Sequence, residues 1–263
     1  MIPPTTAATR WINEYGSIMD LWQADDGAIV GLYASSTGST GTYLVVGWAA
    51  GAPPSAQCGQ SVSLSIYWRS LDGGAGDPSW HWVSGLGGQR LLGVEGQPDS
   101  MPLSHAMVAT TDFPGLAGPG TYIDKLLYRA QGPSPAGSAA PRVAGGAEAD
   151  PVDGLWQCRE EPGLRLTLRL ADSGYGYVEG TLLRGDEAHP VRGVTDGGAL
   201  AAGLDRQGVA VTAPGGQGYS LALAGSLARD GLMTLTAFTS QGTAPGNGYL
   251  QTRLGALTFV KAG

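Results

Sequence analysis

The sequence W-I-N-E-Y-G-S at residues 11–17 begins a run of similar segments that continues with G-A-I-V-G-L-Y-A-S at 27–35, T-Y-L-V-V-G-W at 42–48 and S-L-S-I-Y-W at 63–68. Each segment is short, rich in β-branched and aromatic residues, and bounded by Gly, Asp or Ser. Short segments of this composition that alternate with turn residues are typical of a meandering antiparallel sheet. The first half of the chain is therefore predicted to be all-β.

Polar residues recur at every second position in this sheet. Asn13, Tyr15 and Ser17 would share one face of a strand, and Tyr33 and Ser35 would share a face of the next. Polar residues near strand ends are often simply solvated. A polar face among apolar strands, however, predicts groups that need hydrogen-bond partners inside the fold.

The pattern W-x-N-x-x-G-S, followed by D-G-x-x-x-G-x-Y-x-S and a strand ending in Trp, resembles avidin and streptavidin. In that family the Asn, Ser and Tyr donate hydrogen bonds to the ureido oxygen of biotin. The resemblance assigns these roles to Asn13, Ser17 and Tyr33, and it places Ser35 and Trp68 in the same site. It also implies an eight-stranded up-and-down barrel, which can enclose one small ligand.

The segment S-W-H-W-V-S-G at residues 79–85 leaves two strand registers open. In the favoured register Ser79, His81 and Val83 face the interior, because the following Ser-Gly pair then fits the family without a gap. A shift of one residue would instead turn Trp80 and Trp82 inward.

Further along, the resemblance is looser. Met107 and Tyr122 occupy positions where the family has tryptophans, and His105 is expected to point the same way as Met107. The family's Trp at the Tyr122 position reaches into a neighbouring subunit's site. The family's late Asp or Asn acceptor falls near Ala130, so that acceptor is missing.

Residues 131–150 are rich in Pro, Gly, Ala and Ser and predict a linker between a first barrel at 1–130 and a second at 151–263. After the linker, G-L-W-Q-C resembles the opening of the first barrel, and residues 232–261 resemble the family's last two strands. The prediction is a tandem of two eight-stranded antiparallel up-and-down barrels. Cys158 and Leu182 stand where Asn13 and Tyr33 stand, which predicts a filled core and no site in the second barrel.

Composition narrows the classes of partner. The chain has 263 residues, a formal net charge of −7 and only 15 Lys and Arg, which argues against nucleic acid. No apolar run is long enough for a membrane span, and no signal peptide is visible, so we expect a cytoplasmic protein, or a secreted one if a leader was trimmed. Cys58 and Cys158 are expected to be unpaired thiols rather than a disulfide. No cofactor or metal is expected, and a homo-oligomer stays open.

Two functions from different classes fit these residues. The first is a binder of a small molecule, with biotin or another metabolite that carries a carbonyl or carboxylate oxygen as the ligand. The second is a cyclase or isomerase in which Asn13, Ser17 and Tyr33 stabilise a developing oxyanion and His81 or His105 acts as acid or base. The sequence favours the binder, since the residues it shares with the family are those of a binding site.

Overall fold

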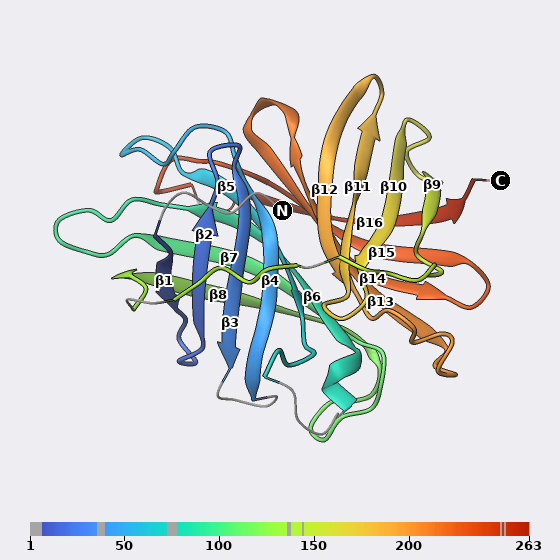
Figure 1. The fold of residues 1–263 in the computed structure, drawn as a ribbon. Helices are drawn as coiled ribbons and strands as arrows, with labels where there is room; N and C mark the ends of the chain where they lie inside the picture. The colour runs from blue at the N-terminus through green and yellow to red at the C-terminus, as the bar shows by residue number, and fades with distance from the viewer. Residues whose placement is uncertain are drawn as a thin grey trace.

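The structure, a computed structural model, describes residues 7–35, 40–72, 78–135, 138–143, 145–247, 249 and 251–262. The chain forms two closed barrels, each of eight antiparallel strands (Figure 1). This confirms the predicted all-β class and the pair of eight-stranded barrels. In the described part of the chain no helix is long and apolar enough to cross a membrane.

The strands of both barrels follow one another in space in the order of the sequence, and the ninth strand closes the second barrel between the tenth and the sixteenth. The first barrel consists of β1 (Thr9–Ile12), β2 (Ile18–Gln23), β3 (Ala28–Ser35), β4 (Gly41–Ala50), β5 (Gln60–Tyr67), β6 (Trp82–Arg90), β7 (Ser100–Ala109) and β8 (Gly120–Pro133). The second consists of β9 (Gly154–Cys158), β10 (Leu164–Asp172), β11 (Tyr177–Arg184), β12 (Glu187–Thr195), β13 (Arg206–Gly215), β14 (Tyr219–Ala228), β15 (Leu232–Gln241) and β16 (Thr252–Lys261). Two short 3-10 helices, η1 (Pro78–His81) and η2 (Gly216–Gly218), precede β6 and β14.

Alternation along the strands builds the two cores. In β10 the residues Leu164, Leu166 and Leu168 are buried, whereas Arg165 and Thr167 between them are exposed. The second barrel has an almost entirely aliphatic core around Trp156 and Phe259. The first barrel has a core rich in Tyr and Trp, whose hydroxyl and indole groups place polar atoms within the core itself.

Strands β4 to β6 are buried on both faces because their outer face packs against the second barrel. Glycines permit this close approach: a Cβ at Gly85 would lie 2.7 Å from the Cβ of Ala224, and one at Gly87 would lie 2.7 Å from the Cβ of Phe238. The two barrels therefore share an apolar interface within one chain, with strands of one packed across strands of the other.

Hydrogen bonds tie the barrels together at the edges of this interface. Gln89 and Thr243 bond each other reciprocally, with Nε2 to Oγ1 at 2.9 Å and Thr243 N to Oε1 at 2.8 Å. Asp196 of the second barrel accepts a hydrogen bond from Tyr67 Oη at 3.0 Å and lies 2.8 Å from Nδ1 of His81.

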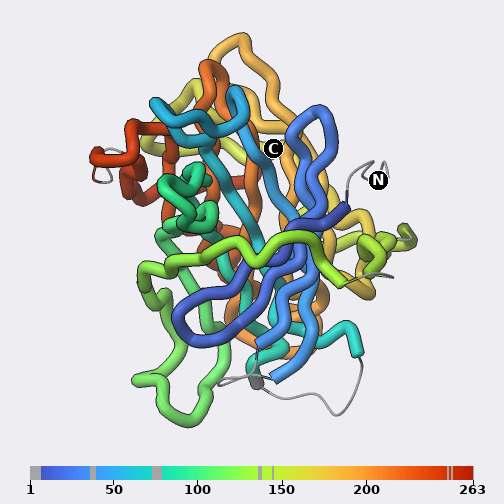
Figure 2. Tube along the Cα trace, turned by 90° about the vertical axis from the view of Figure 1, so that its left-hand side faces the viewer, coloured from blue at the N-terminus to red at the C-terminus, as the bar shows by residue number. Residues whose placement is uncertain are grey.

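The connection between the barrels begins later than the sequence predicted, because β8 continues through Pro133 and pairs with β1. The chain then passes across β2, β3 and β4 towards the second barrel, as the side view also shows (Figures 1 and 2). Ser134 anchors its start, with Oγ 2.7 Å from Asp20 Oδ1, and Ala140 and Val143 pack on the interface. Residues 136, 137 and 144 of the predicted linker lie outside the described residues.

Candidate functional site

A tight turn between β1 and β2 presents the first polar residues of the candidate site. Asn13 Oδ1 accepts hydrogen bonds from the backbone N–H groups of Ser17 at 2.9 Å and Tyr15 at 3.1 Å, and Gly16 supplies a positive φ of 82°. The expected strand over these residues is wrong, because β1 ends at Ile12. Tyr15 consequently points outward with 56% of its surface exposed, and its hydroxyl lies 3.4 Å from a carboxylate oxygen of Asp124.

Asn13, Ser17 and Tyr33 nevertheless meet inside the first barrel. All three are buried. Burial raises the pKa of the Tyr33 phenol, and hydrogen bonds with Ser17, Tyr128, Ser35 and Asn13 act against that rise. One hydroxyl thus interacts with four polar side chains from three parts of the barrel. We call Asn13, Ser17, Tyr33, Ser35 and Tyr128 the polar cluster.

Tyr128 is the member of the polar cluster that the sequence analysis missed. Its fully buried hydroxyl lies 3.5 Å from Asn13 Nδ2, and burial raises its pKa well above the ordinary value. The family's acceptor was expected near Ala130, two residues further on. Ala130 instead pairs with Trp11, next to a β-bulge at which the register of β8 shifts. Alternation along β8 would have placed Tyr128 on the same face as Ala130 and so could have revealed it.

Aromatic rings and a histidine form the wall beside the polar cluster. The Trp68 ring centroid lies 5.6 Å from that of Tyr33 and 5.2 Å from that of Tyr43. The indole N–H of Trp68 donates to Ser84 Oγ at 2.8 Å, and His105 Nε2 lies 2.8 Å from the same oxygen. Burial lowers the pKa of His105 to about 4, so its imidazole is neutral near pH 7 and can accept the proton of Ser84.

The favoured register of residues 79–85 is wrong. Ser79 and His81 belong to η1, and the alternation starts only at Trp82, which packs in the core of the first barrel. Val83 faces the second barrel instead. His81 is directed to the interface, where Nδ1 lies 2.8 Å from Asp196, and this hydrogen bond raises the pKa of His81. Residues in a 3-10 turn do not alternate between two faces. The prediction started the alternation at Ser79, inside this turn, and therefore assigned the inward positions of β6 one residue out of register.

The alternative register is right for Trp82 and wrong for Trp80. Trp80 lies half-buried in η1, with the Arg69 guanidinium carbon 5.5 Å from its ring centroid. His81 lies at the interface between the barrels and not in the interior of the first barrel. Of the two histidines that were expected to face inward, only His105 does so. The enzymatic alternative therefore loses one of its two candidate bases.

Met107 and Tyr122 face each other across β7 and β8 and pack, half-buried, against the core of their own barrel. The Tyr122 hydroxyl donates to the Gly118 carbonyl at 2.6 Å. Within the described residues no group of three or more His, Cys, Asp or Glu could hold a metal ion. Cys58 and Cys158 are both free thiols, as the sequence predicted.

An eight-stranded antiparallel barrel closed around a buried polar cluster is the architecture of barrels that hold one small ligand. The model of the avidin family matches residues 1–89 of this chain, which confirms the resemblance to that family in the segment that holds Asn13, Ser17, Tyr33 and Trp68.

Among solved structures, the chain is similar in fold to rhizavidin in complex with biotin, with 18% identity over 49% of this chain and 96% of that chain and a TM-score of 0.37. It is also similar to rhizavidin alone, with 18% identity over 52% of this chain and 90% of that one and a TM-score of 0.37. None of the curated proteins matches the sequence.

Proposed function

We propose that the first barrel binds a small molecule through a carbonyl-type oxygen, and that biotin is the first ligand to test. The observation that carries this proposal is the meeting of Asn13, Ser17 and Tyr33 at one buried point. Three donors around one position suit an oxygen with two lone pairs, and burying such donors without an acceptor costs free energy.

The Tyr128 hydroxyl provides a hydrogen-bond acceptor from the protein itself at this point. This hydroxyl can accept from Asn13 Nδ2 when no ligand is bound, and a ligand oxygen can replace it as the acceptor. The proposed binding step is thus an exchange of one oxygen for another within the polar cluster. We expect the exchange to make binding weaker than a site with a fixed acceptor would allow, because part of the hydrogen-bond energy is already present in the free protein.

The same geometry favours binding over catalysis. His105 is the one histidine that lies inside the first barrel among the described residues, and its pKa of about 4 makes it a weak base near neutral pH. General bases work best when their pKa lies near the working pH. The cyclase or isomerase alternative would also need His105 close to the reacting atom, whereas its Nε2 is engaged with Ser84.

A thermal-shift titration with biotin and with 2-imidazolidinone, the bare cyclic urea, tests the proposal on the full chain. Biotin should raise the unfolding temperature, and the urea should do so weakly at high concentration. Tyr33→Phe should weaken binding by about 1–3 kcal/mol, or roughly 5- to 150-fold, because one donor to the ligand oxygen is lost.

The matched control is Tyr175→Phe, which removes a phenol hydroxyl from the second barrel and should leave the shift unchanged. If neither compound raises the unfolding temperature, or if Tyr33→Phe binds as well as the unmodified chain, the proposal fails.

A further inference from the structure

A cavity of about 700 Å³ opens at one end of the second barrel, where the sequence predicted a filled core. Leu182 and Leu221, which belong to the aliphatic core, also line this cavity. The sequence prediction therefore holds for the middle of this barrel and not for its open end.

The inward-facing side chains of the second barrel change from aliphatic in its middle to charged at this end. On β11 the inward series runs from the buried Val178 through Leu182 to Arg184. On β16 it runs from Leu257 through Gly255 to Arg253, and a Cβ at Gly255 would meet no atom within 4 Å. Strand alternation directs both arginines to the barrel axis, and the glycine leaves room beside one of them.

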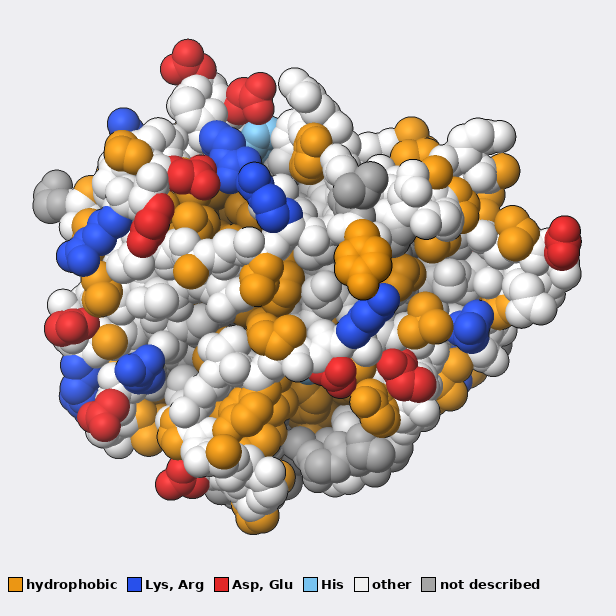
Figure 3. Space-filling model, turned by 180° about the vertical axis from the view of Figure 1, so that it is seen from behind, with side chains coloured by type: hydrophobic (Ala, Val, Ile, Leu, Met, Phe, Trp, Pro, Cys, Tyr) orange, Lys and Arg blue, Asp and Glu red, His pale blue; other side chains and the backbone are white. Residues whose placement is uncertain are grey.

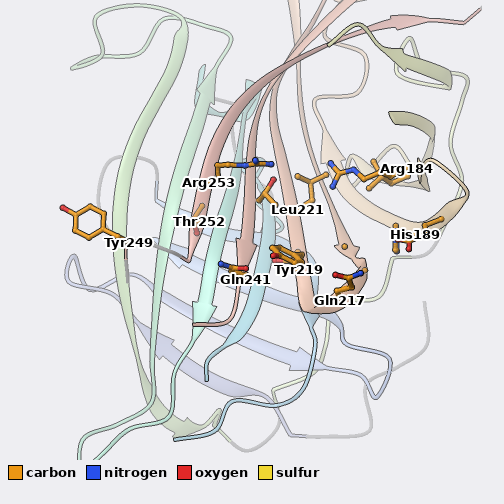
Figure 4. A pocket seen from close by; sticks show the side chains of 15 residues that line it. Arg184, His189, Gln217, Tyr219, Leu221, Gln241, Tyr249, Thr252 and Arg253 are labelled. Carbon is orange, nitrogen blue, oxygen red and sulfur yellow. The ribbon is translucent and has the colours of Figure 1, made fainter. Parts of the chain in front are cut away.

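The two arginine side chains extend towards each other on either side of Leu221 (Figure 4). The nearest acid to Arg184 is Glu161, with Nη2 and Oε2 3.7 Å apart. Arg253 makes no ion pair with any of the residues that the structure describes. Two guanidinium groups that face each other repel. An anion bound between them would be attracted to both and would offset this repulsion.

Among the residues that the structure describes, the one carboxylate that lines the cavity is held at its rim. Glu187 Oε2 lies 3.4 Å from Nε2 of His189, and it sits so close to Gly216 that an added Cβ there would lie 2.8 Å from it. On the surface that the second barrel forms, basic and acidic side chains both lie next to a histidine (Figure 3). The cavity lining is thus positive although the chain as a whole carries a net charge of −7.

The first barrel braces this rim. In η2, Gln217 has a positive φ of 60°, a conformation uncommon for residues other than Gly, and Gly218 has a φ of 82°. A Cβ at Gly51 would lie 3.1 Å from the Cα of Gly218, so the β4–β5 loop packs on the turn. On the other side, Gly59 N donates to Thr243 O at 2.9 Å. A rim fixed in this way loses little conformational entropy when a ligand binds.

We propose that this cavity binds a small organic oxyanion, a carboxylate or a phosphate ester with a short apolar body. Its oxygens lie between Arg184 and Arg253, and its apolar part contacts Leu182 and Leu221. Guanidinium groups bind carboxylate and phosphate oxygens in bidentate geometry, which accounts for the choice of this class. The site does not depend on the function proposed for the first barrel, since it uses none of the residues of the polar cluster.

Isothermal titration of the full chain with hexanoate, hexyl phosphate and hexanamide tests this site. Hexanoate or hexyl phosphate should bind, with an affinity that falls as salt is added, and the neutral hexanamide should not. The relative affinity of the two anions identifies the preferred class. Arg184→Gln and Arg253→Gln should each weaken anion binding by at least about tenfold, because each removes a charge-assisted pair of hydrogen bonds.

Arg165→Gln is the matched control, because this arginine is exposed on the outer face of the same barrel. It should leave the titration unchanged, and circular dichroism should show all three variants folded. Binding of hexanamide as tight as that of hexanoate, anion binding that survives both cavity variants, or no binding of either anion would overturn the proposal.

Discussion

Inside the first barrel the hydroxyl of Tyr128 lies 3.5 Å from Nδ2 of Asn13, at the position where the proposed function requires a ligand oxygen. The chain thereby satisfies its own buried donor from strand β8. In a barrel without such a tyrosine, water would have to satisfy this donor when no ligand is bound. The Tyr128 hydroxyl should therefore stabilise the free protein and at the same time oppose ligand binding.

Tyr128→Phe should destabilise the free protein and improve ligand binding. Removal of the hydroxyl leaves Asn13 Nδ2 without its acceptor, which should lower the free energy of unfolding by about 1–2 kcal/mol in urea titrations. The ligand oxygen then meets a donor that is already free, so biotin affinity should rise by severalfold in calorimetry. A loss of binding in this variant would instead make the Tyr128 hydroxyl a direct contact of the ligand.

The fold was predictable because two local signals agree along most strands. Alternation in segments such as L-R-L-T-L-R-L of β10 specifies one buried face, and Gly or Asp turns separate the strands. The tandem arrangement followed from the repeat of the first-barrel pattern around Trp156. The interface between the barrels was not predictable. Glycines in a strand, such as those at 85 and 87, usually indicate a turn or a bulge, and only the structure shows that here they allow Ala224 and Phe238 of the other barrel to approach closely.

The site was predictable only in part. The resemblance to the avidin family grouped Asn13, Ser17 and Tyr33, whereas strand alternation gave the wrong local structure, because the segment at 13–17 is a turn. His81 was misplaced because a 3-10 turn interrupts the alternation, and a slip of one residue moves a side chain to the other face. The partner of His81, Asp196, lies 115 positions away along the chain, and no local pattern indicates such a contact.

His105 should make the protein less stable as the pH falls from about 6.5 to 4. Burial lowers its folded-state pKa to about 4, whereas the unfolded chain binds a proton near pH 6.5. Stability is therefore fully present above pH 6.5 and decreases below it, by on the order of 2 kcal/mol for a half-buried imidazole. Urea titrations across this range should show the decrease, and His105→Gln should reduce it. Equal pH profiles for the two proteins would contradict the assignment.

The His81–Asp196 pair should have the reverse pH dependence. The hydrogen bond to Asp196 raises the folded-state pKa of His81, so its stabilisation is fully present below the unfolded pKa near 6.5 and is lost as the pH rises through the folded value. Differences in unfolding midpoint between the unmodified chain and His81→Gln should shrink as the pH rises above about 6.5. Asp196→Asn should abolish the dependence, whereas a constant difference at all pH values would rule out a charged pair.

Trp68→Ala should abolish ligand binding, because it removes the aromatic wall beside Tyr33. Its control is Trp156→Ala, which removes a tryptophan that is also buried, from the core of the second barrel. Both should cost about 3–5 kcal/mol in stability, but Trp156→Ala should keep the biotin affinity of the first barrel. Trp68→Phe, which retains much of the apolar contact, should bind with intermediate affinity. Equal loss of binding in both alanine variants would show that the effect is one of stability alone.

The central claim, that the first barrel holds the ligand through its polar cluster, is tested most directly by the stoichiometry of biotinamide binding in isothermal titration. This neutral amide of biotin lacks the carboxylate that the arginine-lined cavity of the second barrel could bind, so it reports on the first barrel. We predict one site per chain, lost in the double variant Asn13→Ala/Ser17→Ala and retained in Leu182→Ala. Two equivalent sites per chain, or a site that survives the double variant, would contradict the account.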